Sequence, residues 1–133
     1  MNKARLLKLA DLLEADAKNP YGVRFNLRDW GKAEDKTPTV DCGTTACAIG
    51  LACLSPEFQA EGLSFDTYFD EDESNWGMRP KYGPRDSWGA VEDFFELSHR
   101  ESYRLFRRSA YEVFKGAEAE LAVAARIREM VAK

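Results

Sequence analysis

The segment from residue 46 to residue 54, Ala-Cys-Ala-Ile-Gly-Leu-Ala-Cys-Leu, constrains the fold more than any other part of the chain, because it contains no charged side chain. A helix that is apolar on all sides must be buried. The following Ser55-Pro56 ends the run, since proline cannot donate the next helical hydrogen bond. We therefore predict a buried helix here, whose small glycine and alanine residues let another element approach closely.

Two amphipathic helices are predicted near the ends of the chain. Residues 3–17 place apolar side chains at i, i+3, i+4, i+7 and i+11, namely Leu6, Leu9, Ala10, Leu13 and Ala17. Asn19-Pro20 ends that helix. Residues 117–132 form the last predicted helix, and its expected inward side chains are Leu121, Ala124, Ile127 and Val131.

Two further helices are predicted between residues 87 and 106. Ser87 has the chemistry of an N-cap for a helix that carries Trp88, Val91, Phe94, Phe95 and Leu97. Ser98 and Glu101 have the Ser-x-x-Glu spacing of a capping box, so a new helix is expected to begin there and to include Leu105 and Phe106.

The signal for β-structure is confined to a few segments. Residues 63–68 alternate apolar and polar side chains, and residues 77–82 are the expected partner strand across an acidic turn. Residues 25–30 are interpreted as a short strand or an extended segment, and residues 31–38 as a polar loop. The predicted fold is therefore a mostly helical α+β domain over residues 1–133, with about five helices and a small β-hairpin.

Chain length predicts one domain, and the cysteine spacing and the lack of long apolar segments favour the cytoplasm. A chain of 133 residues is in the usual range for one core. Its three cysteines are an odd number within twelve residues, which is not the spacing of a secreted disulfide framework. We find neither an apolar signal segment nor a run long enough to span a membrane. The net charge of −4 argues against non-specific nucleic-acid binding.

The cysteines Cys42, Cys47 and Cys53 are the first candidate for chemistry. On one helix they would not converge on a metal ion, because residues 42 and 47 would lie roughly 140° apart around its axis. His99 is the only histidine, so no fourth ligand is evident. We expect no metal and no cofactor, and we interpret Cys47 and Cys53 as buried core residues.

Cys42 remains a candidate nucleophile, because a cysteine at a helix N-terminus can have a lowered thiol pKa. Asp41-Cys42-Gly43 is similar to the nucleophile region of bacteriocin-processing, papain-like peptidases, in which Asp-Cys-Gly opens the central helix. The chain departs from that pattern by one extra residue before Cys47 and lacks the downstream histidine in a strand. Only His99 could serve as the base, so a cysteine-dependent hydrolase or transferase is an alternative hypothesis.

A stripe of arginines is the second candidate for function. Its members follow the i, i+4, i+7, i+8 spacing of one helix face: Arg100, Arg104, Arg107 and Arg108. Guanidinium groups suit carboxylate or phosphate recognition. The stripe is interpreted either as a solvated face, alone or paired with the acidic turn at residues 70–73, or as a binding face for an acidic protein or a nucleic acid.

Several segments together resemble a family of small bacterial and phage proteins that share a Cys-Gly-Thr-x-x-Cys segment. The segments that carry the resemblance are 25–27 with Trp30, 42–50, 94–98 with 105–106, and 124–128. The resemblance implies an accessory factor of the kind found in phages and other mobile elements. It implies no activity and no functional residues.

The leading hypothesis is a non-enzymatic accessory protein that acts through its surface on another macromolecule, and the expected partner is a protein. No catalytic triad, phosphate-binding loop or paired catalytic carboxylates are evident in the sequence. A nucleic-acid-binding module that uses the arginine stripe is a second alternative to this hypothesis, beside the cysteine-dependent enzyme. A homodimer is a reasonable expectation for a small domain, and no membrane partner is expected.

Overall fold

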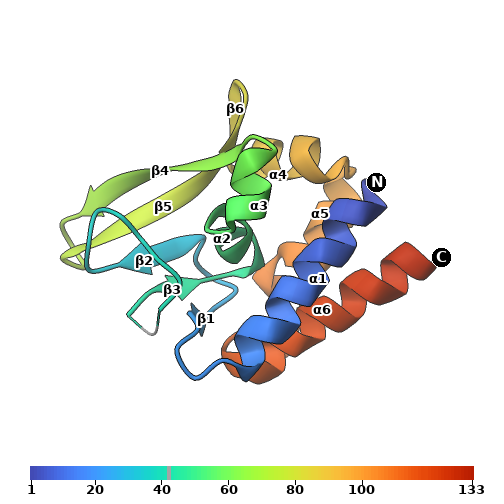
Figure 1. Ribbon diagram of the computed structural model, residues 1–133, viewed down its shortest axis with the longest axis horizontal. Coiled ribbons are helices and arrows are strands. Elements are labelled where there is room, and N and C mark those ends of the chain that lie inside the picture. Colours follow the sequence, from blue (N-terminus) through green and yellow to red (C-terminus); the bar gives the residue numbers. More distant parts are fainter. Residues whose placement is uncertain (42) are drawn as a thin grey trace.

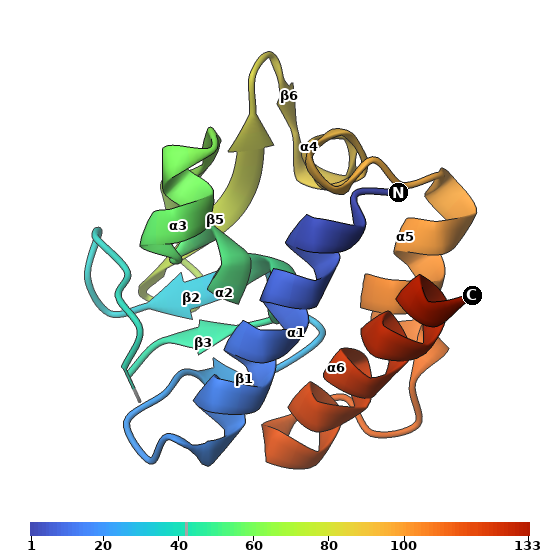
Figure 2. The same ribbon diagram turned by 45° about the vertical axis from the view of Figure 1, so that its right-hand side comes forward.

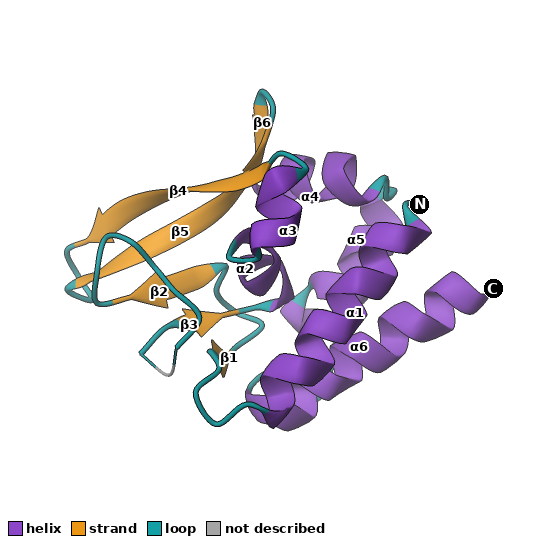
Figure 3. Cartoon of the chain, viewed as in Figure 1, coloured by secondary structure: helices purple, strands orange, loops and turns teal. Residues whose placement is uncertain are grey.

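The computed structural model describes residues 1–41 and 43–133 of the chain. Figures 1 and 3 show helices on one side of the molecule and a sheet on the other. The helices are α1 (Lys3–Lys18), α2 (Ala48–Cys53), α3 (Pro56–Ala60), α4 (Ser87–Phe95), α5 (His99–Phe106), the 3-10 helix η1 (Arg108–Ala110) and α6 (Gly116–Ala132). The strands are β1 (Arg24–Phe25), β2 (Gly31–Ala33), β3 (Thr45–Ala46), β4 (Leu63–Asp70), β5 (Asn75–Tyr82) and β6 (Arg85–Asp86).

The sheet is larger than the sequence predicts. Its strands lie in the order β1-β3-β2-β5-β4, and β6 pairs with β5. β1 is parallel to β3, whereas the other pairs are antiparallel. The prediction of a mostly helical domain with a small hairpin is therefore wrong, because the hairpin supplies only two strands of a six-stranded mixed sheet. β1, β2, β3 and β6 have only two or three residues each, too few to show a period of two.

The predicted hairpin is confirmed and forms the longest part of the sheet. β4 and β5 pair from Leu63 with Tyr82 to Asp70 with Asn75, across the acidic turn. By contrast, the predicted polar loop at residues 31–38 is wrong at its start. β2 begins at Gly31 and joins the hairpin to β3.

The central apolar helix is buried, as the sequence predicts, but it is shorter than the apolar run. All six residues of α2 are buried, and Cys47 is its N-cap residue with extended backbone. Gly50 is required for this packing, because a Cβ atom there would overlap the carbonyl oxygen of Trp30. The close approach expected at this segment is therefore made by the chain that leads into β2.

The two terminal helices lie side by side in Figures 1 and 2 and run in opposite directions. Leu6, Leu9 and Leu13 of α1 are buried, as the spacing predicts. On α6, Val123, Ala124 and Ile127 are buried. Leu121 was expected to face inward, but it is 43% exposed. The inward face of α6 is therefore rotated away from Leu121 and contains Glu120 instead.

The capping box between α4 and α5 is confirmed. The Ser98 side chain accepts a hydrogen bond from the Glu101 backbone N–H, and the Glu101 carboxylate accepts one from the Ser98 N–H. α4 begins one residue earlier than predicted, with Asp86 at the N-cap and Ser87 inside the helix. None of the helices in the described part of the chain has the length and apolarity needed to cross a membrane.

Candidate functional site: an arginine pocket and a buried acid pair

The predicted arginine stripe does not continue along one helix. Arg100 and Arg104 lie exposed on α5, but this helix ends at Phe106. Arg107 has extended backbone and Arg108 begins η1. The end of the helix therefore directs the second half of the stripe toward other elements, and the four arginines do not form a single face.

Arg107 lies on an aromatic surface. Its guanidinium carbon is 4.1 Å from the centroid of the Trp88 ring and 5.8 Å from that of Tyr103. The Trp88 ring in turn contacts Trp30, with centroids 4.6 Å apart. Arg107 Nε is buried and has no hydrogen-bond partner among the described residues. Stacking therefore fixes the plane of this guanidinium while one of its donors remains unused.

Two further arginines, Arg28 and Arg108, pack on the ring of Phe114. The guanidinium carbons of Arg28 and Arg108 lie 4.3 Å and 4.7 Å from the centroid of the Phe114 ring. This arrangement depends on pairing between distant segments, because the Leu27 N–H donates to the Phe114 carbonyl at 2.7 Å. An isolated bridge between Asn26 and Lys115 extends that pairing. Arg28 is thereby brought beside a residue that is distant in sequence.

These arginines surround a pocket of about 310 Å³. Two tryptophans and several apolar side chains line it as well. Among the described residues the lining is Leu27, Arg28, Asp29, Trp30, Cys47, Trp88, Phe106, Arg107 and Arg108. We call this hollow the arginine pocket. Neither Arg100 nor Arg104 lines it, and sequence reasoning missed Arg28, Trp30 and Trp88 as site residues.

The arginine pocket carries excess positive charge. Within residues 1–41 and 43–133, no carboxylate lies within 4.0 Å of a guanidinium nitrogen of Arg28, Arg107 or Arg108. Asp29 lines the pocket, but its carboxylate is paired with Lys32 at 3.5 Å. Lys32 also pairs with Glu73 of the acidic turn. The expected pairing of the arginine stripe with that turn is therefore not formed by these arginines.

The two cysteines that the structure describes are core residues, as predicted. Cys47 and Cys53 are buried free thiols. Burial raises the pKa of Cys47 to about 11, and it raises the pKa of Cys53 further. The Cys47 thiol donates weakly to the Trp30 carbonyl at 3.8 Å. Both thiols are therefore neutral at pH 7 and suited to packing rather than to nucleophilic attack.

The candidate nucleophile Cys42 lies outside the described residues. His99, its only possible histidine partner, lies at the start of α5 and is largely exposed. The imidazole Nδ1 of His99 is 3.3 Å from the Glu92 carboxylate. The hollow beside residues 41 and 43 is lined by residues 33–35, 37–39, 41, 43 and 44 in the part that is described, and none of these is a histidine.

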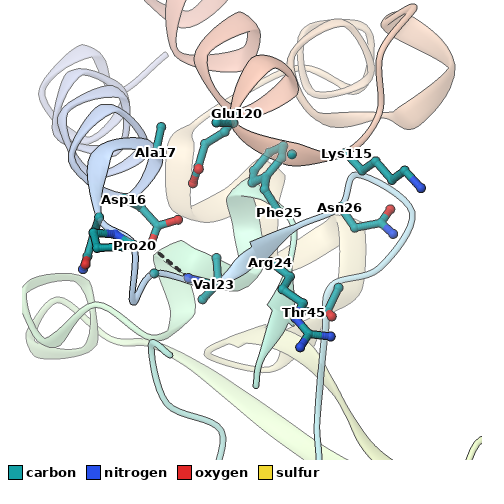
Figure 4. A pocket seen from close by; sticks show the side chains of 14 residues that line it. Asp16, Ala17, Pro20, Val23, Arg24, Phe25, Asn26, Thr45, Lys115 and Glu120 are labelled. Carbon is teal, nitrogen blue, oxygen red and sulfur yellow. Dashed lines mark hydrogen bonds between the residues drawn. The ribbon is translucent and has the colours of Figure 1, made fainter. Parts of the chain in front are cut away.

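A larger hollow lies where α1 and α6 meet β1, and sequence reasoning missed it. Figure 4 shows Asp16 of α1 and Glu120 of α6 pointing toward one another beside it. Asp16 is 8% exposed and Glu120 is 2% exposed. Asp16 Oδ1 accepts a hydrogen bond from the Val23 N–H at 3.2 Å, whereas Asp16 Oδ2 and Glu120 Oε2 have no partner among the described residues.

One shared proton explains how two carboxyl groups can be buried together. Burial raises the pKa of Glu120 to about 10, and the hydrogen bond to Asp16 and the charge of Asp16 raise it as well. Glu120 is therefore protonated at pH 7 and can donate to Asp16. The sequence does contain a signal for this pair. Asp16 follows Leu9 by seven residues and Glu120 precedes Ile127 by seven, so each acid is in phase with an apolar stripe.

Comparison with known proteins gives no functional assignment for the arginine pocket or the acid pair. No protein-family model, curated protein sequence or solved structure matches the chain.

Proposed function

We propose that this protein is a non-enzymatic binding protein that holds an acidic side chain of a partner protein in the arginine pocket. The observation that carries the proposal is the convergence of Arg28, Arg107 and Arg108 on one pocket without carboxylate partners among the described residues. A guanidinium group binds a carboxylate through paired N–H donors. The stacked planes of these three arginines keep such donors available to a ligand.

The tryptophans of the pocket favour a protein ligand over a simple anion. Trp30 and Trp88 both line the hollow, so an apolar group beside the bound carboxylate can be covered at the same time. Binding energy at protein interfaces is concentrated on arginine and tryptophan residues in small desolvated pockets. An acidic residue of the partner with an apolar neighbour therefore fits the pocket best.

The charge of the whole chain supports a protein partner rather than a nucleic acid. The net charge of −4 produces a field that opposes a long phosphate backbone. A pocket of about 310 Å³ is also small, so it suits one side chain and its neighbour rather than a duplex groove. The arginine cluster is thus a local positive site on an acidic protein.

We also propose that this binding protein is cytoplasmic. Its support is that Cys47 and Cys53 are free thiols in the core. Reduced thiols of this kind persist in a reducing compartment.

A titration with matched peptides tests the proposed function. The probes are a hexapeptide of alternating glutamate and leucine and the same peptide with glutamine in place of glutamate. In a Trp76→Phe background, which removes the one tryptophan outside the pocket, fluorescence of Trp30 and Trp88 reports binding. We expect the glutamate peptide to bind with an affinity that falls as salt is raised from 50 to 300 mM, because salt screens exposed charges. The glutamine peptide should bind at least tenfold more weakly.

Two double variants separate the pocket from the rest of the stripe. The first double variant, Arg107→Gln with Arg108→Gln, should bind the glutamate peptide at least tenfold more weakly. Arg100→Gln with Arg104→Gln removes the same charge outside the pocket and should change affinity less than threefold. Equal losses in both variants would show a diffuse electrostatic effect and contradict the proposal. Tighter binding of a labelled 20-base-pair duplex than of the peptide, lost in the pocket variant, would favour the nucleic-acid function instead.

A further inference from the structure

The cleft beside the acid pair is a second candidate site, separate from the arginine pocket. It has a volume of about 680 Å³, and none of the described residues lines both hollows. Its lining comes from the end of α1, the loop into β1, β1 itself, β3 and the start of α6. The cleft is therefore formed by four separate elements that the fold holds together, as Figure 4 shows.

The acid pair supplies acceptors that the described part of the protein does not use. Asp16 and Glu120 are each more than nine-tenths buried, and each carboxyl group has one oxygen without a partner there. A buried acceptor without a donor is costly. The shared proton satisfies one of these oxygens at most. A positively charged N–H donor in the cleft would satisfy both. Gly22 lets the chain pass close to the Asp16 carboxylate, because a Cβ atom there would overlap it.

The rest of the cleft has the opposite charge. Among the residues described, the charged side chains that line it are Asp16 and Glu120 together with Arg24 and Lys115. Arg24 and Lys115 form no ion pair with a described carboxylate. Val23 and Phe25 contribute apolar surface to the same cleft. The cleft thus offers acidic, apolar and basic surface.

We propose that this cleft binds a small zwitterion, with its ammonium group on Asp16 and Glu120 and its carboxylate toward Arg24. An apolar α-amino acid has this chemistry. A simple amine would leave Arg24 unpaired, and a simple carboxylic acid would leave the buried acceptors unsatisfied. Occupation of the cleft would also tie α1 to α6 and β1, the elements that supply its lining.

Binding involves one proton with a defined origin. In the empty cleft the Glu120 carboxyl is protonated, because its pKa is raised to about 10. When an ammonium group enters, the Glu120 proton is released to solvent and the ammonium cation replaces it. The total charge of the complex then equals that of the empty protein plus the zwitterion minus one proton. Calorimetry in two buffers of different ionisation enthalpy measures this release.

The test uses L-leucine and L-phenylalanine, each beside its decarboxylated amine and its deaminated acid. Isothermal titration calorimetry at pH 7 with the full chain measures affinity and proton release. We expect at least one amino acid to bind at least tenfold more tightly than its amine and its acid, with release of up to one proton. Magnesium and calcium chloride are titrated separately.

Variants identify the site. Glu120→Gln should weaken binding of the amino acid at least tenfold and abolish proton release. Circular dichroism of this variant should show the wild-type fold. Arg24→Gln should lower the affinity for the amino acid to nearly that for its amine. Glu118→Gln, an exposed acid on the same helix that does not line the cleft, should change neither quantity.

Three results would overturn the proposal. The first is the absence of binding by both amino acids at 10 mM. The second is amino-acid binding that Glu120→Gln leaves unchanged, which would place the ligand elsewhere. The third is tight binding of magnesium or calcium that Glu120→Gln removes, which would make the acid pair a cation site. None of these outcomes depends on the arginine pocket, so failure here leaves the proposed function untouched.

Discussion

Arg107 lies with its guanidinium carbon 4.1 Å from the centroid of the Trp88 ring, so a residue just beyond α5 packs on a residue of α4. The relationship depends on where α5 begins and ends. The capping box fixes its start at Ser98, and its last residue is Phe106. One further helical residue would carry Arg107 around the helix axis and away from the tryptophan. The geometry of the arginine pocket is therefore a consequence of helix termination.

Replacement of Arg107 by lysine should weaken binding of the glutamate-leucine peptide about tenfold, although the charge of the protein is unchanged. Lysine lacks the planar fork that binds a carboxylate and stacks on an indole ring. Tryptophan fluorescence titration measures the change. Arg100→Lys on the exposed face of α5 is the matched control and should bind like the wild type. An Arg107→Lys variant of full affinity would show that the pocket uses charge alone.

Ser98→Ala should lower the free energy of unfolding by about 1 kcal/mol, as for other N-cap serines. The variant loses the hydrogen bond from the Glu101 N–H, which is 3.1 Å from Ser98 Oγ. Urea denaturation followed by circular dichroism gives the value. Ser64→Ala removes an exposed hydroxyl that caps no helix and should cost less. Equal losses in the two variants would be inconsistent with a capping role.

Gly50→Ala should lower the free energy of unfolding by about 3 kcal/mol, the upper part of the range for overpacked cores. The new methyl group would overlap the Trp30 carbonyl oxygen, which is backbone and cannot rotate away. Gly89→Ala in α4 is the control, since the atoms nearest to a Cβ there belong to the long side chain of Arg85 and not to backbone. A Gly50→Ala protein as stable as the Gly89→Ala protein would contradict this account of the α2 packing.

Much of the helical structure could be predicted because its signals are local. The spacing of Leu6, Leu9 and Leu13 marks α1, and the Ser98 to Glu101 spacing marks the start of α5. The hairpin of β4 and β5 has eight-residue strands, which are long enough to alternate. β1 and β3 lack such a signal, because two residues cannot show a period. They are strands only because they pair with each other and with their neighbours.

The candidate sites depend on contacts that no local pattern contains. Arg107 and Arg108 could be selected from the sequence, but Arg28 joins them only because residue 27 pairs with residue 114. Asp16 and Glu120 are brought together by the packing of α1 against α6. Their signal was nevertheless present, since an acid within an apolar stripe must be buried with a partner or a proton. That criterion could have identified the pair before the fold was known.

Cys47 and Cys53 should resist modification in the folded protein. In a Cys42→Ser variant these are the only two thiols, and burial keeps both protonated by raising the pKa of Cys47 to about 11 and that of Cys53 further. A disulfide reagent at pH 8 should label less than about one tenth of them in an hour, because it reacts with the thiolate. Full labelling should follow in 6 M guanidinium chloride. Rapid labelling of the native variant would show that this part of the core opens readily.

The free energy of unfolding should fall as pH rises from about 5.5 to 8.5, because of Glu120. Its pKa is raised from 4.5 to about 10 in the folded chain by burial and by Asp16, so above pH 5 the folded state retains a proton that the unfolded state has lost. Stability conferred by a raised pKa is greatest at low pH and is lost as pH increases, with a slope of up to about 1.4 kcal/mol per pH unit for one proton. Glu120→Gln has no such proton to retain. Urea denaturation curves of that variant should therefore give a nearly flat profile over this range, above the wild type at pH 8.5, whereas Glu118→Gln should keep the wild-type slope. Parallel slopes for the wild type and Glu120→Gln would mean that Glu120 ionises normally in the folded chain, and the shared proton of the acid pair would have to be abandoned.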